Sequence, residues 1–491
     1  MHLRRIQVPD FRVLKDVDLI FEKEFIPRVF PLGSQNGGGK STLLQLIFVL
    51  LHCSTNPDRF PAIKNILNGF KIHNDTGKRV LAIIEIWDTN RSIELEFFAC
   101  KDSYINQLFK LDNGSGEQES NIFSFSTINK SENLKKRISR FAGERLEIED
   151  IINELENIIN LSDEAERYFK FDRITYRLDK LGIRRRERTI REKNSIMEIQ
   201  KDVTEQLESL HNKYRKLQIE SVRLSRKAEK ITEYLKSENL VYIGNYSSEG
   251  EKDEDEAILC QVKNLNTEET KPFLDYLSNK VFLAAPSTQV FLFLSQENRK
   301  LLFKEQDKLL SSETYYSRLK RANSMLPGLF TYDFLAVDLL IDSFKAARDR
   351  DFKEAIETGE YGNSYKILLN DINSMLTNKQ VYLKSDLSGV AFKMDKNDET
   401  IELYPEDLSH GELKRLSIYM WLKYRNIDNS LVLMDEIEIA LHPDWQYRIV
   451  SDLTQWAVNN QYILATHSYE LCQALTPTHV KELEPTLLKQ L

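Results

Sequence analysis

Residues 33–42 read Gly-Ser-Gln-Asn-Gly-Gly-Gly-Lys-Ser-Thr, and this stretch decides the fold. It follows a strand-like segment that ends in the apolar run 28–32, and it precedes apolar residues at helical spacing from Leu43 to Leu51. A strand, a glycine-rich loop and a helix in this order direct backbone N–H groups and a helix N-terminus at an anion. We therefore predict a phosphate-binding loop. Its predicted ATP-binding residues are Asn36, Gly37, Gly38, Gly39, Lys40, Ser41 and Thr42.

The loop departs in one place from the pattern G-x-x-x-x-G-K-[ST] of ATP-binding proteins. Ser34 stands where the pattern has its first glycine, and Gly33 lies one position early. The first glycine eases the turn out of the strand, so we expect Gly33 to serve in a slightly different loop. Lys40 is predicted to reach the β- and γ-phosphates, and Ser41 to hold Mg²⁺.

Two further segments end in polar side chains after apolar strands. Leu433-Met-Asp-Glu436 closes with two carboxylates, and Ile463-Leu-Ala-Thr-His467 closes with a histidine. Each motif is weak by itself, because strands often end in solvated polar residues. At the carboxyl edge of a parallel sheet, Asp435 suits the Mg²⁺ shell, while Glu436 can orient and deprotonate the attacking water. His467 is then predicted to sense the γ-phosphate and steady the water.

A fourth segment, Leu408-Ser-His-Gly-Glu412, opens a predicted helix. By itself it is an N-capped helix start. Its hydroxyl, its glycine and the helix dipole also suit a second phosphate contact.

In order and spacing, these four segments resemble an ABC-type ATPase. The opening of the chain, with Arg12-Val-Leu-Lys-Asp-Val-Asp-Leu-Ile-Phe21 ahead of the loop, is similar to the SMC, RecF and OLD ATPases, and Asp435-Glu-Ile-Glu-Ile-Ala-Leu-His-Pro443 resembles the OLD and RecF side. The resemblance implies two heads that sandwich two ATP molecules, hence a homodimer or a higher even-numbered oligomer that uses ATP and Mg²⁺.

The resemblance also implies roles for further residues. Ser409, Gly411 and Glu412 would bind ATP in trans, and a glutamine would contact Mg²⁺ or water. Gln289, just after a predicted strand, is the candidate for that glutamine. Glu438 and His442 match the family pattern, but helix entry and packing explain them equally well.

The predicted fold class is α/β: an ABC-type P-loop ATPase head with a helical lobe and a helical, partly coiled-coil insertion. Residues 1–130 and 406–491 form the head, 131–245 the insertion, 246–280 an acidic connector and 281–405 the helical lobe. Two alternating runs, 80–87 and 93–98, predict a β-hairpin, and the polar segment 113–129 predicts a loop.

A heptad pattern marks the insertion. Apolar residues recur every seven positions from Val203 to Ile231, with a second row from Leu207 to Leu235 that Ser221 interrupts. The pattern predicts a helix of roughly 45 residues, about 65 Å long. Two interpretations remain open: an arm that communicates with a partner or with DNA, or a long helix packed on its own domain.

Composition narrows the class of protein. With 491 residues, 41% of them hydrophobic, the chain can form more than one core, and its net charge is -8. The longest apolar stretch, 281–294, is interrupted by polar residues, so we expect no membrane span and a cytoplasmic location. The four cysteines lie far apart, which argues against a zinc site or a disulfide framework.

The layout most resembles the PtuA ATPases of Septu-type and retron-associated antiphage systems, which act with a separate HNH nuclease, PtuB. OLD nucleases continue after the histidine with a nuclease domain, whereas the sequence ends 24 residues after His467, so we expect no nuclease domain in this chain.

Two other functions stay open. One is a RecF- or SMC-like DNA repair or recombination ATPase that binds DNA directly, and the other is a scaffold that senses nucleotide without hydrolysing it.

A dense basic cluster lies next to the heptad segment. It contains Lys180, Arg184, Arg185, Arg186, Arg188, Arg191 and Lys193. The acidic net charge argues against broad DNA affinity, yet this cluster could contact DNA, a retron DNA–RNA molecule or a protein partner. A solvated helix surface explains it equally well.

Overall fold

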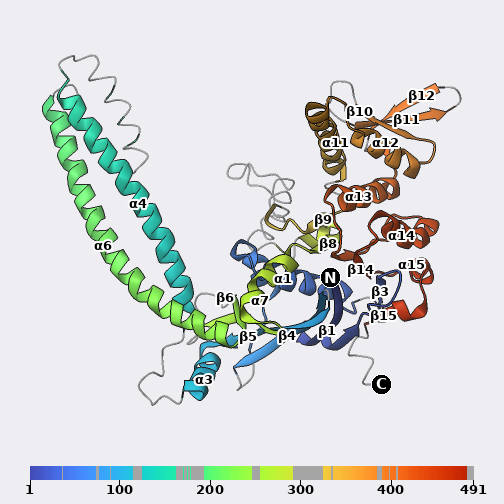
Figure 1. The fold of residues 1–491 in the computed structure, drawn as a ribbon, viewed down its shortest axis with the longest axis horizontal. Coiled ribbons are helices and arrows are strands. Elements are labelled where there is room, and N and C mark those ends of the chain that lie inside the picture. The colour runs from blue at the N-terminus through green and yellow to red at the C-terminus, as the bar shows by residue number, and fades with distance from the viewer. Residues whose placement is uncertain are drawn as a thin grey trace, which may run out of the picture. The chain divides into compact units, whose positions relative to one another are not determined.

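The structure is a computed structural model. It describes residues 1–35, 37–72, 77–88, 90–113, 124–161, 170, 174, 177, 193–245, 255–290, 293, 324–332, 336–383, 390–396, 399–404 and 407–483. The chain forms two compact units, which we call the head unit and the arm unit (Figure 1). The head unit contains 1–101, 237–249 and 256–491, and the arm unit contains 102–236 and 250–255. Every helix that the structure describes is too short or too polar to cross a membrane.

A six-stranded parallel sheet organises the head unit. Its strands, in spatial order, are β15 (Lys481–Glu482), β3 (Val29–Gly33), β14 (Gln461–Ala465), β13 (Leu431–Asp435), β8 (Val281–Ala285) and β9 (Leu329–Thr331). Each neighbouring pair is parallel. Strands buried on both faces of a parallel sheet are apolar without alternation, as β13 is. The alternation of strands and helices at the end of the sequence predicted this sheet, and the prediction is confirmed.

Successive residues of β13 enter two different cores. Leu433 packs with α1 (Lys40–Cys53), while Met434 packs on the other face with α13 (His410–Tyr424). Almost every side chain of α1 is buried, as expected of a helix that is covered on all sides. The helix that follows the glycine loop is therefore held firmly in the centre of the head unit.

An antiparallel sheet shares the first of these cores. Its strands, in spatial order, are β2 (Leu14–Ile20), β1 (His2–Phe11), β4 (Lys78–Asp88), β5 (Arg91–Lys101), β7 (Glu256–Lys263) and β6 (Leu240–Asn245). The predicted hairpin is confirmed, with Asp88 paired to Arg91 where β4 turns into β5.

The remaining elements of the head unit are mostly helices. They are α2 (Phe60–Ile66), α7 (Thr267–Ser278), α8 (Ser287–Val290), α11 (Ala336–Thr358), α12 (Ser364–Met375), α14 (Pro443–Trp456), α15 (Tyr469–Gln473) and two 3₁₀ turns, Pro57–Arg59 and Pro477–His479. The predicted β element at 381–403 is confirmed as the antiparallel sheet β10 (Gln380–Leu383), β11 (Val390–Lys396) and β12 (Glu399–Leu403).

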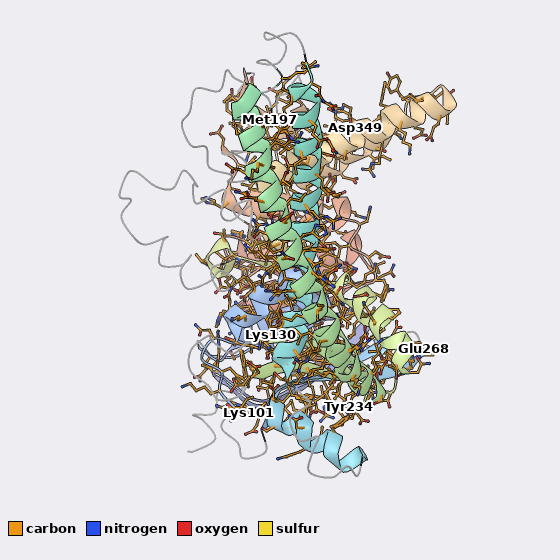
Figure 2. All side chains as sticks on the ribbon, turned by 90° about the vertical axis from the view of Figure 1, so that its left-hand side faces the viewer. Lys101, Lys130, Met197, Tyr234, Glu268 and Asp349 are labelled. Atoms are coloured by element: carbon orange, nitrogen blue, oxygen red, sulfur yellow. The ribbon has the colours of Figure 1, made fainter. Side chains whose placement is uncertain are left out.

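The arm unit is an antiparallel helix pair. After α3 (Asp102–Asn113), α4 (Phe125–Ile159) and α6 (Lys193–Ser237) lie side by side along their length (Figures 1 and 2). The hydroxyl groups of Ser131 and Ser225 lie 3.2 Å apart, and Gln200 donates to Glu156 at 3.2 Å. The helices α4 and α6 therefore run in opposite directions.

The heptad prediction matches the burial of α6. The helix has 45 residues, and every position of the two predicted rows is buried or half-buried. Val203 and Leu207 pack with Ile151 and Leu155 of α4. The seam is thus occupied by a helix of the same chain, which supports the interpretation of a helix packed on its own unit. Contact of the arm with a partner or DNA stays a prediction.

The structure places several boundaries differently from the sequence analysis. The predicted connector 246–280 contains β7, an interior strand of the antiparallel sheet, and α7. The predicted helical lobe 281–405 contains β8 and β9 of the parallel sheet, and the insertion begins at Asp102 instead of 131. Residues 125–129 of the predicted loop 113–129 belong to α4, which begins at Phe125. Short apolar strands flanked by charged residues caused these errors, because only their pairing partners show that they are buried.

The cysteines pack as small apolar residues. All four are free thiols, and Cys53, Cys100 and Cys260 are buried. Burial raises the pKa of Cys53 to about 12, so this thiol stays protonated.

Candidate nucleotide-binding site

The loop after β3 has the backbone that a phosphate cradle needs. Gly37 and Gly39 have φ angles of 82° and 91°, a region that side-chain-bearing residues rarely adopt. A Cβ at Gly38 would lie 2.7 Å from Ser34 Cβ, and one at Gly39 would lie 2.6 Å from Leu14 Cδ2. The three glycines therefore fit by conformation and by space. Asn36 lies outside the described residues, and Thr42 lies in the first turn of α1.

Lys40 is folded back onto its own loop. Its ammonium group donates to the carbonyl oxygen and the hydroxyl oxygen of Ser34, both at 3.1 Å, and the residue is 6% exposed. Burial lowers the pKa of Lys40, while the nearby Asp435 opposes that change. The serine that departs from the P-loop pattern is therefore a direct partner of the loop lysine, which sequence comparison with the pattern did not reveal.

Asp435 ends β13 beside the loop and is 1% exposed. The side-chain amide of Gln289 donates to its carboxylate, and Gln289 in turn accepts a hydrogen bond from Gln45 of α1 at 2.9 Å. Burial raises the pKa of Asp435 to about 6, against the opposing hydrogen bonds from Ser41 and Gln289. Gln289, chosen from the sequence, thus lies next to the predicted Mg²⁺ ligand. No motif in the sequence marked Gln45 as part of this site.

These residues fit Mg²⁺ with a bound phosphate. The described residues include no group of three or more His, Cys, Asp or Glu side chains that would hold a metal by themselves. Mg²⁺ typically uses one or two carboxylates together with phosphate oxygens and water. A buried aspartate in contact with Ser41 and close to Lys40 is suited to that arrangement.

Glu436 follows in an unusual backbone conformation. Its φ angle is 50°, in the left-handed region, and its N–H donates to the carbonyl of Ala465 at 2.9 Å. Strain of this kind costs about 1–3 kcal/mol and collects at functional sites. The turn places Glu436 immediately beyond the sheet edge, next to the end of β14.

His467 lies two residues beyond β14, and its side chain is exposed. Its backbone N–H donates to Glu438 Oε1 at 2.6 Å, which ties the segment after β13 to the segment after β14. Among the described residues, the buried Oε2 atom of Glu438 has no hydrogen-bond partner. Glu438 is therefore more than a helix-entry residue, because it fixes the backbone that carries His467.

Ser409 and Glu412 form a capping box at the start of α13. Ser409 donates to Glu412 Oε2 from its N–H at 3.0 Å and from its hydroxyl at 2.8 Å. Lys379 contacts both carboxylate oxygens at 2.8 and 2.7 Å. Desolvation acts to raise the pKa of Glu412, but the hydrogen bonds from Lys379 and Ser409 outweigh it, so this pKa is lowered.

The residues predicted from sequence fall into three sets. The structure gathers Lys40, Ser41, Gln289, Asp435 and Glu436 at one edge of the parallel sheet. Ser409 caps the N-terminus of α13, Gly411 and Glu412 lie in its first turn, and the action of all three in trans stays a prediction. Arg184, Arg185, Arg186 and Arg188 lie outside the described residues.

Comparisons with known proteins agree with an ATPase. Residues 271–473 match the family described as "AAA domain, putative AbiEii toxin, Type IV TA system". The "Retron Vc95 probable ATPase" of Vibrio cholerae is 26% identical over 194 residues, which is 36% of this chain and 34% of that protein. The "Retron Ec83 probable ATPase" of Escherichia coli is 28% identical over 98 residues, 20% of this chain and 17% of that protein. The chain therefore spans about a third or less of the length of these curated relatives.

Solved structures give a weaker likeness. The Smc head domain with an extended coiled coil from Pyrococcus furiosus, bound to the C-terminal domain of ScpA, aligns over 96% of this chain and 91% of that chain, with 10% identity and a TM-score of 0.30. The Smc head domain with a coiled coil and joint from Pyrococcus yayanosii aligns over 98% and 94%, with 10% identity and a TM-score of 0.32. Similarity at that level does not by itself establish a shared fold.

Proposed function

We propose that the chain is an ABC-type ATPase of the SMC, RecF and OLD kind, and that by binding and hydrolysing ATP it controls a partner HNH nuclease in antiphage defence. The observation that carries the ATPase is the convergence of a glycine loop, a buried lysine and two strand-end carboxylates. Lys40 reaches the loop from the start of α1, Asp435 at the end of β13 contacts Ser41, and Glu436 follows Asp435 in the chain.

Each residue has a role in this proposal. The backbone N–H groups of Gly37–Gly39 and the ammonium group of Lys40 bind the phosphates. Ser41 and Asp435 hold Mg²⁺, which would neutralise the charge that develops on the phosphates, and Gln289 orients Asp435. Glu436 positions water and accepts its proton, and His467 steadies that water.

The defence role rests on two supports. The relatives with matching segments are named as ATPases of retrons. The overall layout, including the loop 33–42 and a moderate helical insertion, resembles PtuA proteins, whose partner is an HNH nuclease. A homodimer or higher even-numbered oligomer follows in the proposal, because Ser409, Gly411 and Glu412 would complete the ATP site of a second copy.

The chemical test is Glu436→Gln, which removes the base and keeps the shape of the side chain. ATP hydrolysis should fall by roughly 10²–10⁴-fold while ATP binding is retained. Glu357→Gln, on the exposed face of α11, is the matched control and should hydrolyse ATP like the wild type. Equal hydrolysis by the wild type and Glu436→Gln would support a scaffold that senses nucleotide instead.

The biological test is an affinity pull-down of the tagged chain, expressed with its neighbouring genes, with and without excess ATP and Mg²⁺. A stoichiometric HNH nuclease would support the proposal. Recovery of DNA only, or of the dimer with no partner, would contradict it and favour a RecF-like repair ATPase.

A further inference from the structure

A buried lysine outside the predicted site holds the backbone of Glu436. Lys414 lies in α13 and is 7% exposed. Its ammonium group donates to the carbonyl oxygens of Glu436 at 2.9 Å and Ile439 at 3.1 Å. The ring of Tyr332 lies on another side, with its centroid 4.1 Å from Nζ. Hydrogen bonds from a charged donor are stronger than neutral ones, most of all away from water.

The segment held by Lys414 needs such support. Glu436 has a φ angle of 50° and Ala440 one of 68°, so two residues with side chains adopt the left-handed region within five positions. Between them, the N–H of Ile439 donates to the carbonyl of Glu436 at 3.3 Å, a long hydrogen bond. A conformation of this kind persists only where its surroundings impose it.

A second contact joins the same helix to the same segment. Gly411, in the first turn of α13, packs against the carbonyl of Ala440, which would lie only 2.6 Å from a Cβ at that position. The turn that contains Ser409 and Glu412 is therefore in contact with the segment at Ala440, while Lys414 binds it at Glu436 and Ile439.

We infer that Lys414 is a positioning residue that holds Glu436 in its working conformation and couples it to the Ser409–Glu412 turn. The inference rests on the proposed ATPase function, and it adds a route by which the Ser409–Glu412 turn acts on the base of the same chain. A shift of α13 moves the two carbonyls that Lys414 binds, and Glu436 moves with them. A misplacement of about 1 Å can cost roughly 10²-fold in rate.

The test compares Lys414→Met with Lys423→Met, an exposed position on the same helix. Two quantities are measured: the kcat and KM of ATP hydrolysis, and amide hydrogen exchange of the peptide that contains 436–441. We expect Lys414→Met to lower kcat by roughly tenfold or more with little change in KM, and to speed exchange in that peptide. Lys423→Met should change neither.

A double variant shows whether Lys414 acts by positioning Glu436 or by a general contribution to the structure. If Lys414 acts through Glu436, Lys414→Met should lower hydrolysis no further when Glu436→Gln is already present. An additional loss of the same size, or unchanged exchange of 436–441 in Lys414→Met, would overturn the inference. A wild type that hydrolyses no ATP would overturn the proposed function, while faster exchange in Lys414→Met would still support the positioning contact. If Lys414→Met does not fold, Lys414→Gln, which keeps one donor, replaces it in all measurements.

Discussion

The parallel sheet of the head unit and the helix pair of the arm unit bury their apolar residues in different ways. Each residue of β13 is buried, and its successive side chains enter two cores on opposite faces. The helix α6 buries one seam against α4 and leaves its other faces to solvent. A substitution in the sheet should therefore displace the strand end that carries Asp435 and Glu436, whereas a substitution in the seam should alter only the arm unit. This difference predicts which substitutions alter ATP chemistry.

The largest effect is expected from Lys40→Met. The variant removes the only charged donor that the glycine loop offers among the described residues, so hydrolysis should fall by at least ~10²-fold and ATP binding should weaken. Steady-state hydrolysis and a nucleotide-binding titration measure both. Lys64→Met, exposed on α2, is the control. Normal ATP binding by Lys40→Met would place the nucleotide elsewhere and break the comparison.

The next largest effect is expected from Lys379→Met, on the pH dependence of stability. It leaves the buried carboxylate of Glu412 without its cation, so the lowered pKa of Glu412 should rise. A carboxylate with a lowered pKa stabilises the fold above its unfolded pKa, and that stability is lost as pH falls through the folded pKa. The wild type should therefore lose more stability than Lys379→Met on acidification through this range. Thermal unfolding across pH 3–6, with Lys379→Arg as the conservative control, would show a difference; parallel curves would contradict it.

A smaller effect on function is expected from Ile151→Ala in the arm seam. Ile151 is fully buried, so truncation should lower the stability of the arm by about 2–5 kcal/mol while hydrolysis stays within about twofold. Leu146→Ala, at a position of α4 that is 56% exposed, is the control for helix propensity. Hydrogen exchange of α4 and α6 reports the stability, and an ATPase assay reports the function. A large loss of hydrolysis would show that the two units are coupled.

The smallest effect is expected from Arg184→Ala combined with Arg186→Ala. If the basic cluster contacts DNA phosphates, binding should weaken and the slope of log K against log salt should fall by about two. ATP hydrolysis without DNA should not change. Unchanged DNA binding would assign the cluster to a protein contact or to a solvated surface.

The sequence points to candidate site residues where a short motif carries its own chemistry. The glycine loop, Asp435-Glu436 and the capping turn at Ser409 each form from neighbouring residues, so their types and spacing are visible in the sequence. Gln289 lies beside Asp435 because it follows β8, the neighbour of β13 in the same sheet, and its contact with Mg²⁺ stays a prediction. Lys414 and Lys379 were not found, because neither a buried lysine on a helix nor a half-buried lysine before a strand has a local pattern that distinguishes it from a solvated one.

The sequence by itself determined the local elements: the loop around Lys40, the apolar strand 431–435, and the heptad seam of α6, because backbone freedom and side-chain periodicity act over a few residues. Only the tertiary structure decided that β7 and β8 belong to the two sheets, that Ser34 binds Lys40, and that Lys414 holds the turn of Glu436. The packing of α13 beside the strand β13 brings Lys414 and Glu436 together. The strand β7 pairs with β5, which is distant in the chain. Contacts of this kind depend on the register and pairing of whole elements, which no single segment encodes.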